Sequence, residues 1–143
     1  MTRDKKSRGK LPSSPSKIST LQPATERTQN TSLKTLKFCL AHIQKGHYVR
    51  CLTDKQRADL ALSIQQRCEM SWNQIILTPK HGLGTENMPA NQIKPKIPEC
   101  FGDREQFIVL RYSGNLPMVG VRIGDVFHVL WIEKHFGDVC DHS

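Results

Sequence analysis

The C-terminal part of the chain holds the feature that most restricts its fold, two apolar runs separated by a Gly-Asp dipeptide. The runs MVGVRI and VFHVLWIE occupy residues 118–123 and 126–133, on either side of Gly124-Asp125. Because β-branched and aromatic residues favour strands and a two-residue turn with glycine favours a hairpin, we expect two antiparallel strands here. FIVLRY at 107–112 is a third such run, followed by the turn sequence SGNLP. The sequence therefore predicts an antiparallel sheet near the C-terminus.

The position of the turn predicts which side chains share a face of the sheet, because successive residues of a strand point to opposite sides. The set expected to meet the helices is Val119, Val121, Ile123, Val126, His128, Leu130 and Ile132. On the other face we expect Arg122 beside Phe127 and Trp131, with Tyr112 on the neighbouring strand. A guanidinium in such a position can stack on an aromatic ring and still bind a phosphate. His128 falls on the core face, where a histidine is more often a hydrogen-bonded core residue than a catalytic group.

The segment before these strands predicts one further strand and two helices. Residues 36–42 alternate with period two, which indicates a strand, and Thr53 and Ser71 are expected to cap two successive helices. Residues 80–102 hold three glycines and three prolines and predict a long connection, whose HGLGTE stretch matches no nucleotide-binding motif. We therefore expect a single α+β domain at 32–143, a small antiparallel sheet of three to five strands packed on a helical hairpin.

The first 31 residues differ from the rest in composition and predict a disordered basic tail. They are rich in Lys, Ser, Thr and Pro. Their seven basic and two acidic side chains give a net charge of +5, which is most of the net charge of +8 of the whole chain. Such a segment buries too little apolar surface to offset the entropy of ordering it. The tail either attracts nucleic acid through counterion release or serves as a solubilising extension, and the sequence leaves both readings open.

Location and cofactors follow from the cysteines and from the apolar runs. The five cysteines form no CxxC pair, and no apolar segment suggests a signal peptide or a membrane span, so we expect reduced thiols and a cytoplasmic protein without membrane partners. His135, Cys140 and His142 are close in sequence, but their spacing matches no standard zinc pattern. We therefore expect no metal and no cofactor.

The C-terminal segment suggests chemistry on RNA. Lys134, His135 and His142 follow the last strand, and imidazoles with lysines and arginines are the groups that a ribonuclease needs. One group deprotonates the ribose 2′-hydroxyl, while others hold the phosphate and protonate the leaving oxygen. Arginine and lysine can stabilise the phosphate without a metal.

The order of the expected elements, together with FIVLRYSGN, MVGVRIGDVFHVLWIE and HFGDVCDH, resembles the RelE/ParE toxin superfamily. The ribonuclease members of that group cut mRNA, commonly on the ribosome, and are neutralised by an antitoxin. The resemblance implies phosphate-binding roles for Arg111 and Arg122 and acid or base roles for His135 or His142. Cys140 stands where such proteins often have a tyrosine, and the connection at 80–102 is long for a minimal toxin.

The sequence thus predicts a small basic RNA-acting protein, a metal-independent endoribonuclease toxin of a toxin–antitoxin or phage-defence system. The expected catalytic residues are His135, His142 and Arg122, and the expected RNA-binding residues are Arg111, Tyr112, Lys134 and Trp131. The expected partners are RNA, including ribosome-bound mRNA, and a small antitoxin protein. The alternative is a non-catalytic nucleic-acid-binding or protein-interaction module, in which aromatic side chains stack on bases.

Overall fold

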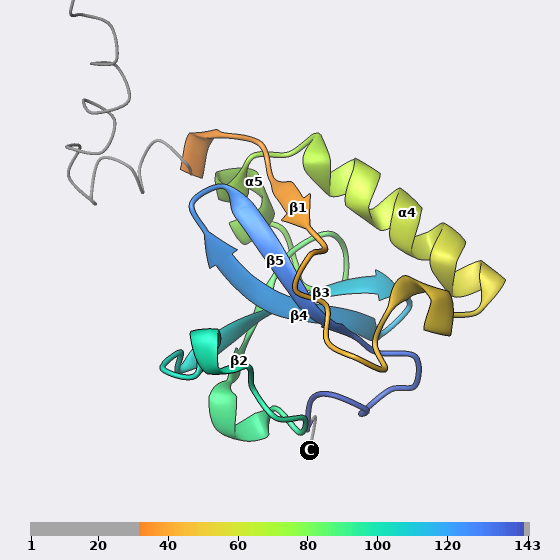
Figure 1. Cartoon of the computed structure of the whole chain (residues 1–143). Helices are drawn as coiled ribbons and strands as arrows, with labels where there is room; N and C mark the ends of the chain where they lie inside the picture. The colour runs from red at the N-terminus through yellow and green to blue at the C-terminus, as the bar shows by residue number, and fades with distance from the viewer. Residues whose placement is uncertain (1–31, 142–143) are drawn as a thin grey trace, which may run out of the picture. The chain divides into compact units, whose positions relative to one another are not determined.

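The computed structural model of the protein describes residues 32–141 (Figure 1). The expected tail at 1–31 and the candidate residue His142 lie outside the described residues. Helix α4 spans Asp54–Cys68 and helix α5 spans Trp72–Ile76. The strands are β1 (Lys37–Cys39), β2 (Glu86–Pro89), β3 (Gln106–Ser113), β4 (Leu116–Ile123) and β5 (Val126–Ile132), with short 3₁₀ helices η1 (Val49–Cys51), η2 (Ala90–Gln92) and η3 (Glu99–Phe101).

The strands form one five-stranded sheet in the order β1-β5-β4-β3-β2, which confirms the expected α+β class. Strands β2 to β5 pair antiparallel with their neighbours, but β1 runs parallel to β5, so the sheet is mixed rather than antiparallel throughout. A parallel pair requires a long crossover, and here the helices and three strands lie between its members. The long connection also contains a strand that was not expected, β2, which pairs with β3.

The hairpin of β4 and β5 turns at Gly124-Asp125, as predicted. Gly124 has a φ of 66°, a left-handed conformation that glycine adopts without steric cost. Val121 lies opposite His128, as the turn position predicted. The two-residue turn therefore sets the register of the half of the hairpin that lies next to it.

Farther from the turn, an irregularity between Val119 and Gly120 shifts the register. Val119 lies opposite Trp131 and not opposite Leu130 as expected. Gly120 approaches β5 so closely that a Cβ atom there would collide with the carbonyl oxygen of His128. The extra residue in β5 reverses the sides expected for the end of that strand, because a bulge interrupts the alternation of side chains.

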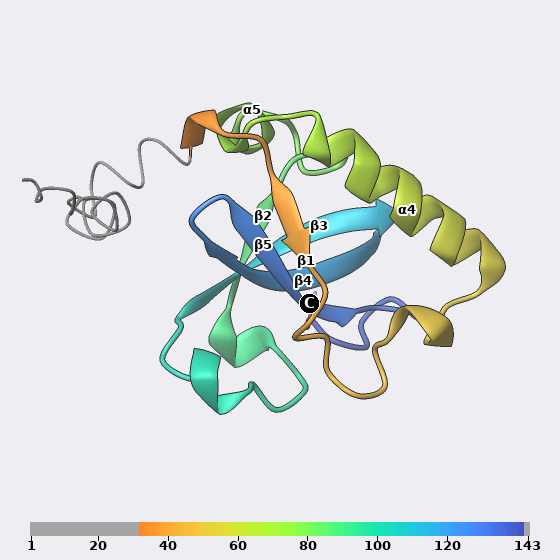
Figure 2. The same ribbon diagram turned by 45° about the horizontal axis from the view of Figure 1, so that its top comes forward.

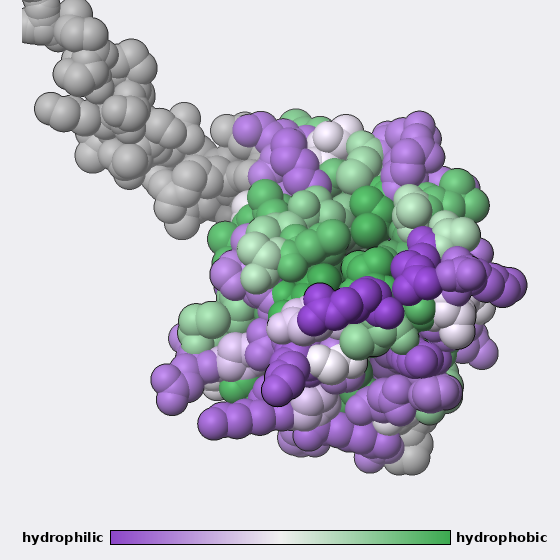
Figure 3. Space-filling model, turned by 45° about the vertical axis from the view of Figure 1, so that its right-hand side comes forward, coloured by the Kyte–Doolittle hydropathy of each residue, from purple (hydrophilic) through white to green (hydrophobic). Residues whose placement is uncertain are grey.

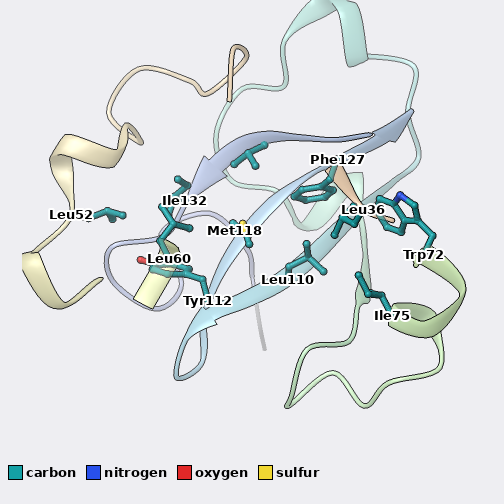
Figure 4. Packing of buried hydrophobic residues seen from close by; sticks show 11 residues of the cluster. Leu36, Leu52, Leu60, Trp72, Ile75, Leu110, Tyr112, Met118, Phe127 and Ile132 are labelled. Atoms are coloured by element: carbon teal, nitrogen blue, oxygen red, sulfur yellow. The ribbon is translucent and has the colours of Figure 1, made fainter. Parts of the chain in front are cut away.

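Helices α4 and α5 cover the face of the sheet opposite to the one predicted (Figure 2). In Figure 4, Leu60 of α4 and Trp72 and Ile75 of α5 lie against side chains from the strands. This helix-side core comprises Leu36, Leu52, Leu60, Trp72, Ile75, Leu110, Tyr112, Met118, Phe127, Val129 and Ile132. The prediction was wrong because both faces of the hairpin are apolar and both are covered, so alternation alone did not identify the side that receives the helices.

A second core fills the other face of the sheet. Its buried members are Met88, Ile93, Phe101, Phe107, Val109, Val119, Val121, Leu130, Trp131, Val139 and Cys140. The connection after β2 and the C-terminal segment close over it, joined by hydrogen bonds from the Lys94 amide to the Val139 carbonyl oxygen and from the Asp141 amide to the Gln92 carbonyl oxygen. The connection at 80–102 is therefore part of the packed structure.

The helices begin where the sequence predicted. The side chains of Thr53 and Ser71 each accept a hydrogen bond from the backbone amide three residues later. The side-chain oxygens of Gln56 and Gln74 accept a bond from the Thr53 and Ser71 backbone amides in turn. These reciprocal capping boxes satisfy amide groups that the first turn of a helix leaves unpaired. Within residues 32–141, no helix has the length and apolar character needed to cross a membrane.

Candidate functional site

Arg122, the predicted phosphate-binding group, is engaged in contacts within the fold. Its guanidinium carbon lies 4.4 Å from the ring centroid of Trp72 in α5. Its Nε donates a hydrogen bond of 2.8 Å to the Gly124 carbonyl oxygen. Burial lowers the pKa of Arg122. The predicted stacking therefore involves Trp72, which the sequence did not suggest, and not Phe127 or Trp131.

Tyr112 and Trp131, two of the predicted RNA-binding residues, are buried. Tyr112 is 5% exposed and donates a hydrogen bond from its hydroxyl to the Glu133 carbonyl oxygen. Burial raises its pKa to about 12. Trp131 is fully buried in the second core. Because stacking on a base requires an accessible ring face, neither residue presents a binding surface in this structure.

Lys134 and His135 lie at the end of the sheet remote from Arg122. Both are exposed and follow β5, whereas Arg122 lies beside the turn that begins β5. The Nδ1 atom of His135 is 3.6 Å from a carboxylate oxygen of Asp138. Cys140 is buried, and burial raises the pKa of its thiol to about 12, so it is not available as an acid or base near neutral pH. The structure therefore does not bring Lys134 and His135 together with Arg122.

Arg111, the remaining predicted residue, lies on β3 at the centre of a polar cluster, close to β2 at the edge of the sheet. Its Nη1 atom lies 3.1 Å from Nδ1 of His81 and donates a 2.8 Å hydrogen bond to Oδ1 of Asn115. Its Nη2 atom lies 3.5 Å from Oε1 of Glu86. Lys80 reaches the other carboxylate oxygen of Glu86 at 3.6 Å. A guanidinium, an imidazole, a carboxylate and an amine thus meet at one place.

The protonation of His81 follows from its partner. A guanidinium only donates hydrogen bonds, so Nδ1 of His81 must be the acceptor of the bond from Arg111. The proton of the neutral imidazole therefore lies on Nε2, and the exposed His81 ring can present that N–H group to a ligand. The contact with Arg111 therefore selects one tautomer of the His81 imidazole.

Glu86 carries an atom whose hydrogen-bonding capacity is not used. Its Oε1 is buried and accepts no hydrogen bond in the described part of the chain, although it faces the charge of Arg111 at 3.5 Å. The side chain as a whole is 25% exposed. A carboxylate oxygen without a hydrogen-bond donor keeps a lone pair that is able to accept a proton.

A cleft of about 410 Å³ adjoins this cluster, between α4, the loop that holds His81 and the end of β3. Its walls are formed by Asp59, Leu62, Ser63, Gln66, His81, Gly82, Leu83, Arg111, Tyr112 and Gly114. The carboxylate of Asp59 is held by Lys55 at 2.8 Å and by the Ser113 hydroxyl at 2.6 Å, and these hydrogen bonds lower its pKa. The cleft offers an approach for a ligand to Arg111 and His81.

Arg67 fixes the loop that positions His81. It is fully buried, and its guanidinium donates hydrogen bonds to the carbonyl oxygens of Leu83 at 3.1 Å and of Arg111 at 2.9 Å. A further bond joins it to the Ser63 hydroxyl. Burial lowers the pKa of Arg67 to about 10, which leaves it charged near neutral pH. Arg67 therefore ties α4, the loop and β3 together and acts as a positioning residue for the cluster.

Sequence reasoning identified Arg111 but missed His81 and Glu86. Both lie in the HGLGTE stretch, which was considered only as a nucleotide-binding motif. The signal that could have identified them is the residue types, because an imidazole and a carboxylate, both able to transfer protons, occur there within a few residues. What the sequence could not indicate was that β2 pairs with β3 and so places Glu86 beside Arg111.

Comparisons of the chain with known proteins found no match. No family model matches it, and neither a curated protein nor a solved structure matches it. The class that the structure itself defines is a small α+β protein with a mixed five-stranded sheet and a polar cluster at one edge. The geometry of that cluster is therefore the feature that bears on function.

Proposed function

We propose that this chain is a metal-independent endoribonuclease whose catalytic site is the cluster of Arg111, His81 and Glu86. The observation that supports the proposal is that two different nitrogens of one guanidinium face the imidazole and the carboxylate, at 3.1 Å and 3.5 Å. A phosphate that binds Arg111 would therefore have a group able to accept a proton, Glu86, and a group able to donate one, His81, next to the same guanidinium. That is the arrangement that transfer of the phosphoryl group to the ribose 2′-hydroxyl requires.

The proposed reaction assigns one role to each residue. Glu86 accepts the proton of the ribose 2′-hydroxyl, and the resulting oxygen attacks the adjacent phosphorus. The bond from phosphorus to the 5′-oxygen breaks, and protonated His81 supplies the proton for that leaving oxygen. The products are a 2′,3′-cyclic phosphate and a free 5′-hydroxyl. Arg111 stabilises the charge that develops on the phosphate, which is commonly the largest contribution to such catalysis.

Charge supports RNA as the substrate class. The chain carries a net charge of +8, which attracts a polyanion and accelerates encounter at low salt. In the proposed Michaelis complex a phosphate oxygen replaces His81 as the partner of Nη1, which frees the imidazole to take up a proton. Lys80, which faces Glu86, adds a positive charge at the same place.

A second candidate function is a protein-interaction module, and one observation favours it. Several large apolar side chains are exposed, and Figure 3 displays an apolar area in the middle of one face with hydrophilic side chains around it. Over the described residues as a whole, the exposed large apolar side chains are Leu33, Leu40, Leu62, Ile76, Leu77, Ile123 and Phe136. A toxin of the type that the sequence resembles needs a surface for an antitoxin, so a small protein partner is compatible with both functions.

The test is cleavage of a short labelled RNA by the purified protein in the presence of EDTA. We expect wild type to release a fragment ending in a 2′,3′-cyclic phosphate, and to leave an analogue with a 2′-deoxyribose at the cleaved position intact. We expect Arg111→Gln, Glu86→Gln and His81→Gln each to lower the rate about 100-fold or more. Arg57→Gln is the matched control, because Arg57 lies on α4 and pairs with Asp54.

Two outcomes contradict the proposal. Equal cleavage by wild type and by the three site variants means that the activity belongs to another site or to a contaminant. RNA binding without any cleavage, again with normal folding, favours the non-catalytic alternative. The pH profile adds an independent readout, because Glu86→Gln should remove the fall in rate on the acid side and His81→Gln should remove the fall on the alkaline side.

A further inference from the structure

A second cluster of reactive side chains lies at the opposite edge of the sheet, on β1 and β5. It consists of Cys39, His42 and His128, and one ligand atom from each lies within 4.8 Å of the other two. The proposed ribonuclease site uses β2 and β3, at the far end of the strand order. The two clusters are therefore separate, and nothing in the proposed function uses this one.

The backbone brings these three residues together. Cys39 is the last residue of β1 and pairs directly with His128 in the parallel ladder with β5, so their side chains are neighbours on one face. His42 follows in the turn after β1. The chain then returns to β5, where the Gln44 amide donates a 2.8 Å hydrogen bond to the Leu130 carbonyl oxygen. Backbone bonds on both sides of His42 thus anchor the segment to the strand that carries His128.

The rings confirm that the segment is packed at this position. The imidazoles of His42 and His128 have centroids 5.4 Å apart, and His42 also meets the ring of Phe101 edge-on at 5.9 Å. Cys39 and His128 are half-buried, whereas His42 is exposed. The cluster therefore combines fixed ligand positions with one side that is open to solvent.

One ring nitrogen of His128 lacks a hydrogen-bond partner in the described part of the chain. Its Nδ1 atom is buried and has no hydrogen-bond partner among the described residues. A buried polar atom without a partner costs free energy, and in native proteins it usually has a specific reason. An imidazole binds a metal ion through a ring nitrogen that carries a lone pair.

We propose that Cys39, His42 and His128 form a binding site for a divalent transition metal of the zinc type, with the fourth coordination position open. A thiolate and two imidazoles suit Zn²⁺, whereas Mg²⁺ and Ca²⁺ require oxygen ligands. With bonds of about 2.0 Å to nitrogen and 2.3 Å to sulfur, tetrahedral ligand atoms lie about 3.3 to 3.5 Å apart. Metal binding would draw the three ligand atoms, now within 4.8 Å of one another, to that range. On binding, the Cys39 thiol releases its proton to solvent, and the thiolate forms the bond to the metal.

The proposed site ties the shortest strand of the sheet to its neighbour. Strand β1 has only three residues, and its outer edge has no partner strand in the described part of the chain. A metal bound by Cys39 of β1, by His42 of the turn that follows and by His128 of β5 would cross-link the two strands. Binding to the folded state alone raises the stability of that state.

The test uses Co²⁺ as a spectroscopic probe for the full-length protein, followed by displacement with Zn²⁺. We expect one Co²⁺ per chain, tetrahedral absorption, and a thiolate-to-cobalt charge-transfer band that Zn²⁺ removes. Cys39→Ser should abolish the charge-transfer band, and His128→Asn should weaken binding at least tenfold. His42→Ala should also weaken binding at least tenfold, and because His42 is exposed, this variant tests the site without disturbing the core.

Matched controls separate this site from adventitious binding. Cys68→Ser removes an exposed thiol on α4, and His135→Gln removes an exposed imidazole, and neither should alter the titration. The proposal is overturned if the charge-transfer band survives in Cys39→Ser, if His42→Ala binds Co²⁺ like wild type, or if Zn²⁺ leaves Cys39 as reactive toward iodoacetamide as before. Cleavage of RNA in EDTA is measured separately, so either proposal can fail without the other.

Discussion

Glu133 provides the sharpest test of how the C-terminal segment is held. Its carboxylate is fully buried and accepts three backbone hydrogen bonds, from the amide groups of Gly137 at 2.9 Å, Val139 at 2.9 Å and Cys140 at 3.0 Å. Glu133→Ala removes both acceptor oxygens, and with them all three hydrogen bonds. Because Val139 and Cys140 belong to the second core, their amide groups would be left buried without partners.

The magnitude follows from the number of bonds. A hydrogen bond to a charged group contributes about 1.5 to 3 kcal/mol, but part of that is recovered as the side chain itself no longer has to be desolvated. We therefore expect Glu133→Ala to lower the free energy of unfolding by about 3 to 5 kcal/mol, a large share of the stability of a small domain. Glu133→Gln keeps the shape and one acceptor oxygen, so its cost should be smaller.

Urea denaturation followed by tryptophan fluorescence measures this loss, since Trp72 and Trp131 are both buried in the native state. Amide hydrogen exchange should show lost protection at Gly137, Val139 and Cys140 in particular. A loss of stability below about 1 kcal/mol in Glu133→Ala would refute the reasoning, because it would mean that the three bonds stabilise the native state no more than water does.

Three further predictions concern the hairpin and its surroundings. Gly120→Ala should lower the free energy of unfolding by about 3 kcal/mol in urea titrations, because a Cβ there collides with the neighbouring strand. Arg122→Ala should cost about 1 kcal/mol through loss of the contact with Trp72, and should leave the rate of RNA cleavage unchanged. The hydrogen bond from Lys37 lowers the pKa of Asp125, so the stability that this carboxylate contributes is present above about pH 4 and disappears as the pH falls through its folded pKa. In thermal melts, Asp125→Asn should therefore be less stable than wild type at neutral pH and should approach it in acid.

Local features of this fold were predictable because they depend on neighbouring residues. The turn at Gly124-Asp125 and the caps at Thr53 and Ser71 follow from dihedral preferences and side-chain hydrogen bonds within a few residues. The bulge next to Gly120 was not predictable in this way, because the alternation of apolar residues continues through it. It changed the face of the sheet to which the Trp131 side chain points, and Trp131 is buried there because both faces are covered.

The candidate site depends on pairings between distant segments. Arg111 was predicted as a binding residue, but its partners Glu86 and His81 became neighbours only through the pairing of β2 with β3 and the bonds of Arg67. The metal cluster has the same origin. The Cys39-x-x-His42 spacing was visible in the sequence, whereas the third ligand, His128, is supplied by a strand near the other end of the domain.

The parallel pairing of β1 with β5 has a consequence for biosynthesis. Lys37 pairs with Val126, so β1, the first strand of the described domain, has no partner until β5, the last strand, has been synthesised. Closing so long a loop is entropically slow compared with forming a hairpin between adjacent strands. A ribosome making this protein therefore releases nearly the whole domain before β1 can dock, and until then the edge of β5 stays open to other chains.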